Sequence, residues 1–181
     1  MYAITGISGQ IGGVIGRVLL DVRQPVRAVV RDEKKGRAWT ERGCDVALAT
    51  IEDTASLAAA FRGAEAVFAL VPPNLDPQPG FPEARAIGKA LRSALETARP
   101  ARVVYLSTIG ARTSRPNLLN QHAIIEQALK DLPIPITFLR PAWFIENFRV
   151  GCGPRARAGG NFVLPATTPQ ATSDGGNRGC R

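Results

Sequence analysis

The sequence predicts a doubly wound α/β domain, in which helices cover both faces of a parallel sheet. Short apolar runs alternate with longer segments of helical period over residues 1–150, which is the pattern of repeated strand-helix-strand units. Several runs, such as 66–71 and 103–106, are almost continuously apolar, as expected for parallel strands buried on both faces. A glycine-rich turn directly follows the first run. We expect the helical connections between the parallel strands to be right-handed crossovers.

The first unit covers residues 1–31. Its parts, in order, are strand 1–5, the glycine-rich turn 6–12 (GISGQIG), helix 10–22 and strand 25–31. This is the layout of a nucleotide-binding βαβ unit, in which glycines permit a tight turn, close approach of a pyrophosphate and close packing of the helix. The helix N-terminus adds unpaired N–H donors and partial positive charge. An ordinary turn between a strand and a helix is the alternative.

Beyond residue 31 the alternation continues, with strands at 44–49, 65–71, 102–107 and 135–140 and helices at 33–42, 54–62, 81–98 and 117–131. Asp53 precedes helix 54–62 and is suited to cap it. In helix 81–98, apolar and small residues recur at three- and four-residue steps and form one stripe that faces the core: Phe81, Ala84, Gly88, Leu91, Leu95 and Ala98.

Composition excludes several classes of protein. The 181 residues, 45% of them hydrophobic and 21% charged, fit one globular domain. No run approaches the roughly 20 apolar residues of a membrane span, and no secretory signal opens the chain, so we expect a cytoplasmic protein with no membrane partner. Cys44, Cys152 and Cys180 are widely spaced and His122 is the only histidine, so neither a disulfide framework nor a metal site is predicted.

The net charge of +8 favours an anionic partner. Its arginines are scattered over several predicted helices and turns without interleaved aromatic residues, which disfavours nucleic acid. A positive field would instead attract a dinucleotide. Residues 151–181 break the alternation and are rich in Gly, Pro, Thr and Arg. We therefore expect one domain at 1–150 and an irregular or disordered tail at 151–181.

Five segments, together with His122 and Glu126, occur in an order and spacing that resemble the NmrA-like branch of the atypical short-chain dehydrogenase/reductases. The segments are 5–12 (TGISGQIG), 29–31 (VVR), 70–74 (LVPPN), 104–111 (VYLSTIGA) and 137–148 (TFLRPAWFIENF). The resemblance covers residues 1–150 and implies a Rossmann-type domain with NAD(P) across the carboxyl ends of its strands. Family members continue for about another hundred residues that roof the substrate pocket, and we expect this lobe to be largely missing here.

The resemblance also implies the cofactor-binding residues. Those around the pyrophosphate are Gly6, Ser8, Gly9, Gln10, Ile11 and Gly12. Those along the riboses, the adenine and the nicotinamide are Arg31, Asp53, Leu70, Val71, Pro72, Ser107, Thr108 and Pro141. A guanidinium at the end of the second strand suits a 2′-phosphate and favours NADP over NAD.

Some of these residues have structural alternatives. Asp32 can cap the next helix and leave Arg31 as a surface residue, and Asp53 can cap helix 54–62. The prolines after residue 71 can simply end the strand. Ser107 and Thr108 can merely cap the turn after their strand.

The candidate catalytic residues depart from the pattern of typical short-chain reductases. Typical short-chain reductases use a Tyr-x-x-x-Lys pair, but neither Tyr2 nor Tyr105 has a lysine four residues later. The resemblance places His122 where other members carry Lys or His, which implies ribose contact or proton donation. A helix-face pair with Glu126 is the alternative.

We therefore expect an NADP(H)-dependent oxidoreductase that passes hydride to a small quinone-like or carbonyl acceptor. The alternatives are a non-catalytic NAD(P) sensor that binds a regulatory protein partner, and an inactive truncated fragment.

Overall fold

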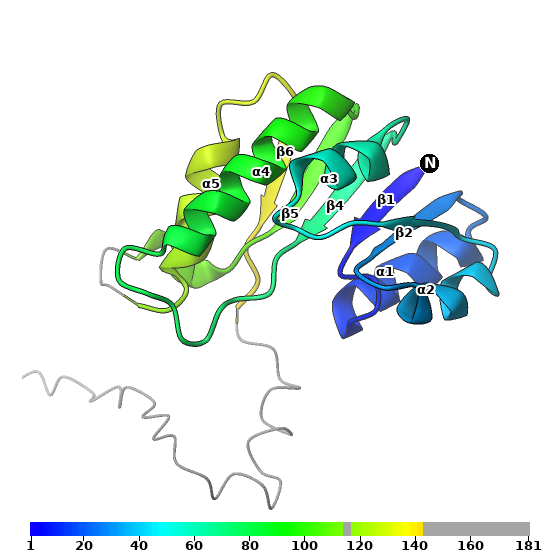
Figure 1. Ribbon diagram of the computed structural model, residues 1–181, viewed down its shortest axis with the longest axis horizontal. Coiled ribbons are helices and arrows are strands. Elements are labelled where there is room, and N and C mark those ends of the chain that lie inside the picture. The colour runs from blue at the N-terminus through cyan, green and yellow to red at the C-terminus, as the bar shows by residue number, and fades with distance from the viewer. Residues whose placement is uncertain (114–116, 143–181) are drawn as a thin grey trace, which may run out of the picture. The chain divides into compact units, whose positions relative to one another are not determined.

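Six parallel strands form one sheet in the order β3-β2-β1-β4-β5-β6 in the computed structural model, which describes residues 1–113 and 117–142 (Figure 1). The strands are β1 (Tyr2–Thr5), β2 (Val26–Val30), β3 (Asp45–Leu48), β4 (Ala66–Leu70), β5 (Arg102–Leu106) and β6 (Ile136–Leu139). The order reverses between β1 and β4, which is the switch point of the Rossmann fold. The predicted doubly wound α/β class is confirmed.

The helices are α1 (Gln10–Asp21), α2 (Glu33–Thr40), α3 (Thr54–Phe61), α4 (Pro82–Ala98), η1 (Ile109–Arg112) and α5 (Asn120–Leu129). Side chains of α1 and α2 pack on one face of the sheet, and those of α3, α4 and α5 on the other. Figure 1 shows α3, α4 and α5 in a row. The 3₁₀ helix η1 was not predicted. None of the helices described for residues 1–113 and 117–142 is long and apolar enough to cross a bilayer.

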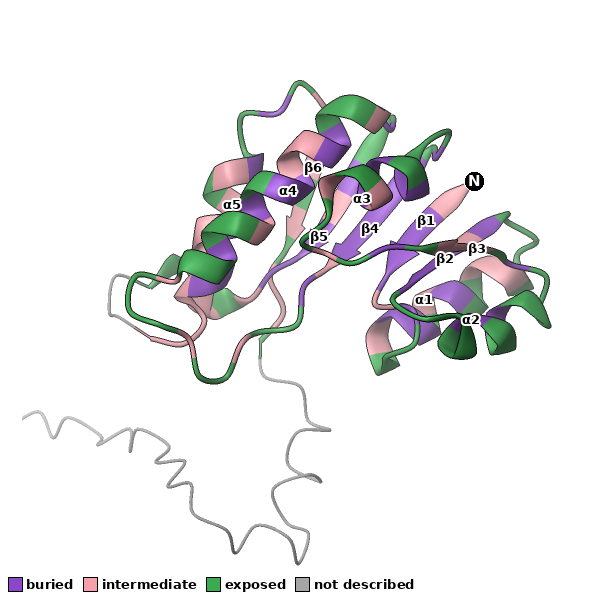
Figure 2. Ribbon diagram, viewed as in Figure 1, coloured by how far each residue is buried: buried purple, intermediate pink, exposed green. Residues whose placement is uncertain are grey.

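The core lies on both faces because successive strand residues point to opposite sides. In β1, Ala3 packs in the cluster under α3, α4 and α5, while Ile4 packs in the cluster under α1 and α2. Most of β1, β2 and β4 is accordingly buried, as the purple ribbon in Figure 2 shows. Leu91 and Leu95 of the predicted α4 stripe are fully buried, and truncating either to alanine would cost about 2–5 kcal/mol.

Glycine lets α1 pack closely on the sheet. An ideal Cβ on Gly16 would lie 2.9 Å from Ile7 Cδ1 and 3.0 Å from a ring carbon of Trp39, both of which are buried. Because the loop 6–12 leads directly into α1, this packing also determines where the loop lies. The predicted boundary at residue 150 and the tail 151–181 lie outside the described residues.

Candidate functional site

The glycine-rich loop joins β1 to α1 and turns at its first residue. Gly6 has a φ of +65°, a left-handed conformation that strains any residue with a Cβ. Its carbonyl accepts a hydrogen bond from the Gly9 N–H (3.0 Å), and the Gly9 carbonyl accepts one from the Gly13 N–H (2.9 Å). The backbone of the loop therefore holds its own shape and makes Gly9 the N-cap of α1.

Gly12 is where α1 comes closest to this loop. An ideal Cβ there would lie 2.5 Å from the Gly6 carbonyl oxygen and 2.9 Å from the Ile7 Cα. Both are backbone atoms, so no side-chain rotation can relieve the contact. The N-terminus of α1 can rest against the end of β1 only because residue 12 has no side chain.

That helix N-terminus has no side-chain cap and no acidic residue in its first turn. In contrast, the Asp32 carboxylate accepts the Lys35 N–H at the start of α2 (2.8 Å), and Asp53 accepts the Ala55 N–H at the start of α3 (3.0 Å). The first N–H groups of a helix lack intrahelical partners and carry the positive end of its dipole. The α1 N-terminus is therefore suited to an external anion.

Thr5 ties the glycine-rich loop to the end of β4 across the switch point. Its hydroxyl accepts a hydrogen bond from the Leu70 N–H (2.7 Å) and lies 3.1 Å from the Leu70 carbonyl. An ideal Cβ on Gly6 would lie 3.0 Å from Leu70 Cδ2, so this leucine covers the turn. Val71 is buried and Pro72 is exposed. The sequence pattern predicted no separate role for Thr5.

Basic side chains gather just after β2. Arg31 is exposed and makes no hydrogen bond or ion pair with any described residue. Asp32 caps α2 as the alternative reading expected, and Lys35 lies 3.9 Å from its carboxylate. Lys34 is also exposed. The Arg31 guanidinium is thus available at the edge of the sheet where the glycine-rich loop lies.

Asp53 is the N-cap of α3, as predicted. The Ser56 hydroxyl and the Ala55 N–H lower the pKa of its exposed carboxyl. This structural role accounts for the residue without a ligand. Its proposed contact with adenine stays a prediction.

The ends of β5 and β6 are joined by backbone hydrogen bonds. The Ser107 N–H donates to the Leu139 carbonyl (2.8 Å), and the Ile109 N–H donates to the Pro141 carbonyl (3.1 Å). Thr108 is the N-cap of η1 through its hydroxyl, which is the turn-cap alternative. Ser107, Thr108 and Pro141 therefore lie together at the carboxyl edge.

An ion pair lies beside these residues. Arg140 makes two hydrogen bonds to the Glu126 carboxylate, at 2.8 and 2.5 Å. Burial by itself would raise the pKa of Glu126, but the Arg140 guanidinium brings that pKa below its usual value. Within the described part of the chain, the Ser107 hydroxyl is the one fully buried side-chain polar atom without a hydrogen bond of standard geometry. Such an atom suits a ligand.

His122 lies in the first turn of α5, and its partner is Tyr105. The Tyr105 hydroxyl is 2.8 Å from His122 Nδ1, and both residues are buried. The imidazole makes no ion pair with Glu126, whose carboxylate is taken by Arg140. The structure therefore does not contain the alternative, an ion pair between His122 and Glu126 on one face of the helix.

Gln121 attaches the loop after β4 to α5. Its amide oxygen accepts the Asn74 N–H (3.0 Å), and its amide nitrogen donates to the carbonyls of Asn74 (2.9 Å) and Leu118 (2.9 Å). Gln121 is buried, so these bonds replace water that it has lost. Sequence reasoning missed both this residue and Tyr105, because their partners are far away in the sequence.

The parallel sheet brings the predicted site residues to one edge. The carboxyl ends of the strands carry residues 6–12, Arg31, 70–72, Ser107 with Thr108, and Pro141. Gln121 and His122 at the start of α5 join them through Asn74. Whether these side chains contact a cofactor stays a prediction. Trp143, Phe144 and Asn147, which belong to the segment 137–148, lie outside the described residues.

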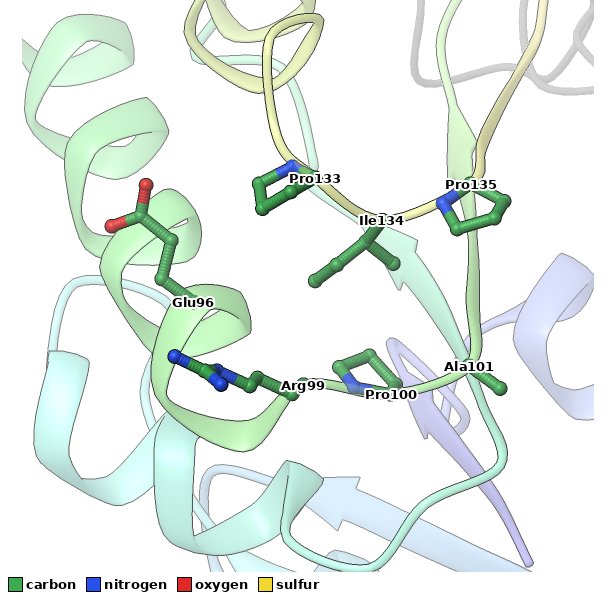
Figure 3. A pocket seen from close by; sticks show the side chains of 7 residues that line it. All are labelled: Glu96, Arg99, Pro100, Ala101, Pro133, Ile134 and Pro135. Atoms are coloured by element: carbon green, nitrogen blue, oxygen red, sulfur yellow. The ribbon is translucent and has the colours of Figure 1, made fainter.

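A groove lies at the opposite edge, where β5 and β6 begin (Figure 3). It is lined by Glu96, Arg99, Pro100, Ala101, Pro133, Ile134 and Pro135. Ligands of open parallel sheets bind at the carboxyl ends of the strands. The groove is therefore on the wrong edge for a dinucleotide.

Comparison with known proteins identifies the family. The model of the NmrA-like family matches residues 2–170. The chain belongs to the NmrA-like family. The resemblance inferred from five sequence segments is thereby confirmed, and it extends into the region where the sequence pattern was expected to be lost.

Two relatives of this NmrA-like chain are reductases. An NAD(P)H azoreductase of Xenophilus azovorans is 27% identical over 166 residues, and quinone oxidoreductase 2 of Escherichia coli (strain K12) is 29% identical over 165 residues. These alignments cover 91% and 90% of this chain and 55% of each relative. The chain thus spans about half the length of the curated relatives it matches.

Two solved structures are similar to this chain. An NADPH-dependent quinone oxidoreductase from Escherichia coli, complexed with NADPH, has a TM-score of 0.71 at 28% identity over 83% of this chain and 52% of its own. A Citrobacter sp. triphenylmethane reductase complexed with NADP(H) has a TM-score of 0.71 at 26% identity over 82% of this chain and 51% of its own. Both proteins bind a nicotinamide dinucleotide phosphate.

Proposed function

We propose that this NmrA-like chain binds NADP(H) and acts in an oxidoreductase that passes hydride to a small quinone-like or carbonyl acceptor. One observation carries the proposal: an uncapped helix N-terminus behind a self-bonded glycine loop lies at the switch point of the sheet. That arrangement suits a pyrophosphate. The named relatives that are azo and quinone reductases support the reaction class.

The residues present fit the cofactor. The backbone of residues 9–12 would receive the pyrophosphate. The absence of a side chain at Gly12 lets the N-terminus of α1 lie against the loop, where a Cβ would collide with it. Leu70 and Val71 would lie along the ribose path, and the buried Ser107 hydroxyl has hydrogen-bonding capacity left for the nicotinamide end. When bound, the nicotinamide supplies the hydride, while the protein binds and orients both reactants.

Arg31 supports NADP(H) over NAD(H). Its guanidinium follows β2, where NAD-selective proteins place an acid, and no described acidic side chain neutralises it. A guanidinium can donate two parallel hydrogen bonds to a phosphate. Lys34 is exposed three residues later and adds positive charge.

Calorimetry with NADPH and NADH tests the proposal. We expect NADPH to bind more tightly, and Arg31→Ala to weaken NADPH binding about 10-fold, the low end for a charge-assisted hydrogen bond at an exposed site. NADH affinity should stay within about 2-fold, because NADH lacks the phosphate. Arg62→Ala removes the same charge from an exposed position before β4, at the opposite edge, and should change neither affinity. A folded chain that binds neither cofactor would contradict the proposal.

A non-catalytic NADP(H) sensor with a protein partner is the second candidate. Neither tyrosine has the lysine of the usual proton-donating pair, and the Tyr105 hydroxyl is held by His122. NADPH oxidation with a panel of quinones, azo compounds and aldehydes separates the two. Turnover that saturates with acceptor supports the enzyme, whereas tight cofactor binding without turnover supports the sensor.

A further inference from the structure

We propose that Tyr105 is a positioning residue that holds His122 as a neutral Nε2–H hydrogen-bond donor, directed to an oxygen atom of the bound ligand. The inference rests on the proposed function for the identity of that ligand. The oxygen belongs either to the nicotinamide ribose or to the acceptor. The state of the His122 ring, however, is a property of the chain without ligand and can be measured separately.

The contact between the two side chains is short and enclosed. Tyr105, on β5, is fully buried, and His122 is 6% exposed. The oxygen-to-nitrogen distance is 2.8 Å, and the ring centroids are 6.1 Å apart with planes tilted by 49°. Phe138 packs edge-on against the other side of the tyrosine ring, with centroids 6.3 Å apart. The phenol is thus confined on both sides.

The phenol is the donor in this bond. Among residues 1–113 and 117–142, the Tyr105 hydroxyl has no partner other than His122 Nδ1. If Nδ1 carried the proton, the buried phenolic hydrogen would have no acceptor, which is unfavourable. With the phenol donating, Nδ1 accepts and the proton of the neutral imidazole lies on Nε2.

Burial keeps both groups neutral. Burial lowers the pKa of His122, and the negative charge of Glu126 opposes that shift only in part. Burial, reinforced by Glu126, raises the pKa of Tyr105 far above its usual range. Tyr105 contacts His122 from β5, and Glu126, one turn later on α5, is the charged group that acts on its pKa. Arg140 pairs with the Glu126 carboxylate, so that carboxylate is not free to pair with a protonated imidazole.

The Nε2 atom is left for a ligand. It makes no hydrogen bond within the described residues, where the partner of the ring is the Tyr105 hydroxyl at Nδ1. Its neighbour in the chain, Gln121, contacts the loop after β4, which places the start of α5 at the carboxyl edge of the sheet. A neutral Nε2–H there can donate to a ligand oxygen without releasing its proton.

Nuclear magnetic resonance tests the ring state directly, because His122 is the only histidine of the chain. In protein labelled with ¹⁵N-histidine, we expect an acceptor-type Nδ1 and a protonated Nε2, with a titration midpoint below the usual 6.5. Tyr105→Phe removes only the hydroxyl and should mix the two tautomers. Phe138→Leu disturbs the packing of the same tyrosine ring but keeps the hydroxyl, so it should leave the tautomer unchanged.

Ligand measurements then identify the oxygen. Tyr105→Phe should worsen one constant about 2- to 10-fold, as for loss of one neutral hydrogen bond. If the oxygen is on the ribose, the NADPH dissociation constant should rise; if it is on the acceptor, KM for the acceptor should rise or kcat should fall. His122→Gln, whose amide N–H can replace Nε2–H, should retain more of this function than His122→Asn. The rate should not decline between about pH 6.5 and 8, because the ring is already neutral there.

An Nδ1–H tautomer in the wild-type chain would overturn the inference, as would a Tyr105→Phe variant with an unchanged tautomer and unchanged constants. Thermal melting establishes whether each variant folds. If Tyr105→Phe does not fold, the tautomer seen in the wild-type spectrum tests the inference by itself. A wild-type ring in the expected state in a chain that binds neither NADPH nor NADH would instead refute the proposed function. The two failures are therefore distinguishable.

Discussion

Gly12→Ala should separate cofactor binding from folding. In the structure, the added Cβ would lie 2.5 Å from the Gly6 carbonyl oxygen, about 0.9 Å closer than the 3.4 Å of an ordinary contact. The obstructing atoms are backbone, so α1 must move away from the loop by most of that amount. The glycine loop and the helix N-terminus would then no longer share one position for the pyrophosphate.

The expected loss follows from the hydrogen bonds affected. Displacing one backbone N–H from a pyrophosphate oxygen removes a bond to a charged group, about 1.5–3 kcal/mol, or about 10- to 150-fold in the NADPH dissociation constant. Stability should change less. Overpacking costs about 1–3 kcal/mol, whereas replacing glycine within a helix recovers about 1 kcal/mol, so the net destabilisation is about 0–2 kcal/mol.

Titration calorimetry with NADPH and thermal melting without ligand are the two assays. Gly13→Ala is the matched control, because its Cβ would lie 3.2 Å from the Ile7 carbonyl oxygen and needs a shift of only a few tenths of an ångström. It offers the same helix propensity one residue away. Equal NADPH affinity for the two variants would refute the role given to Gly12.

Two further predictions concern the edge formed by α5 and β6. Gln121→Leu leaves the Asn74 N–H and carbonyl without partners. It should lower the free energy of unfolding by about 1–3 kcal/mol and speed hydrogen exchange in residues 71–76. Gln127→Leu, at an exposed position of the same helix, should do neither. Glu126 has a lowered pKa, so its ion pair stabilises the fold above the unfolded-state value of about 4.5, and this contribution is lost as the pH falls below it. Glu126→Gln should therefore be less stable near neutral pH in urea titrations, and its curve should converge with that of the wild type in acid; parallel curves would contradict this.

The fold was predictable because its determinants are local. Continuous apolar runs, helical stripes and the Asp53 cap lie within short stretches of sequence, and the structure contains the six strands and five α-helices expected, with shifts of a few residues at their ends. The largest shift is at α5, which begins at Asn120 and not at 117. The Asn117 side chain accepts the Leu119 N–H (2.8 Å), forming a turn that delays the helix.

The 3₁₀ helix η1 escaped prediction for a different reason. Its first residue donates a hydrogen bond to the carbonyl of Pro141, which follows another strand. No pattern within Ile109–Arg112 encodes that contact, and Gly110 in the middle of the segment argues against a helix. The turn depends on β6 being in place beside β5, so only the tertiary structure determines it.

The candidate site likewise has one part that local sequence determines and another that tertiary packing determines. The glycine-rich loop is a contiguous motif, and its geometry follows from its residues. Tyr105 with His122, Arg140 with Glu126, and Asn74 with Gln121 are separated in sequence by a strand, a helix or more. Their pairing depends on how α5 packs against the sheet, and a buried tyrosine in an apolar strand is, from sequence alone, a core residue.

The two halves of the sheet hold their sites by different physical means. On the β1 side, backbone conformation and close packing of glycine define the loop, so a substitution there acts by displacing α1. On the β5 and β6 side, buried polar side chains satisfy one another, so a substitution there acts by leaving a hydrogen-bonding group without a partner. Thr5 joins the halves through Leu70. Changes on the first side should therefore alter cofactor affinity with little effect on protonation, while changes at Tyr105, His122 or Glu126 on the second side should alter protonation states.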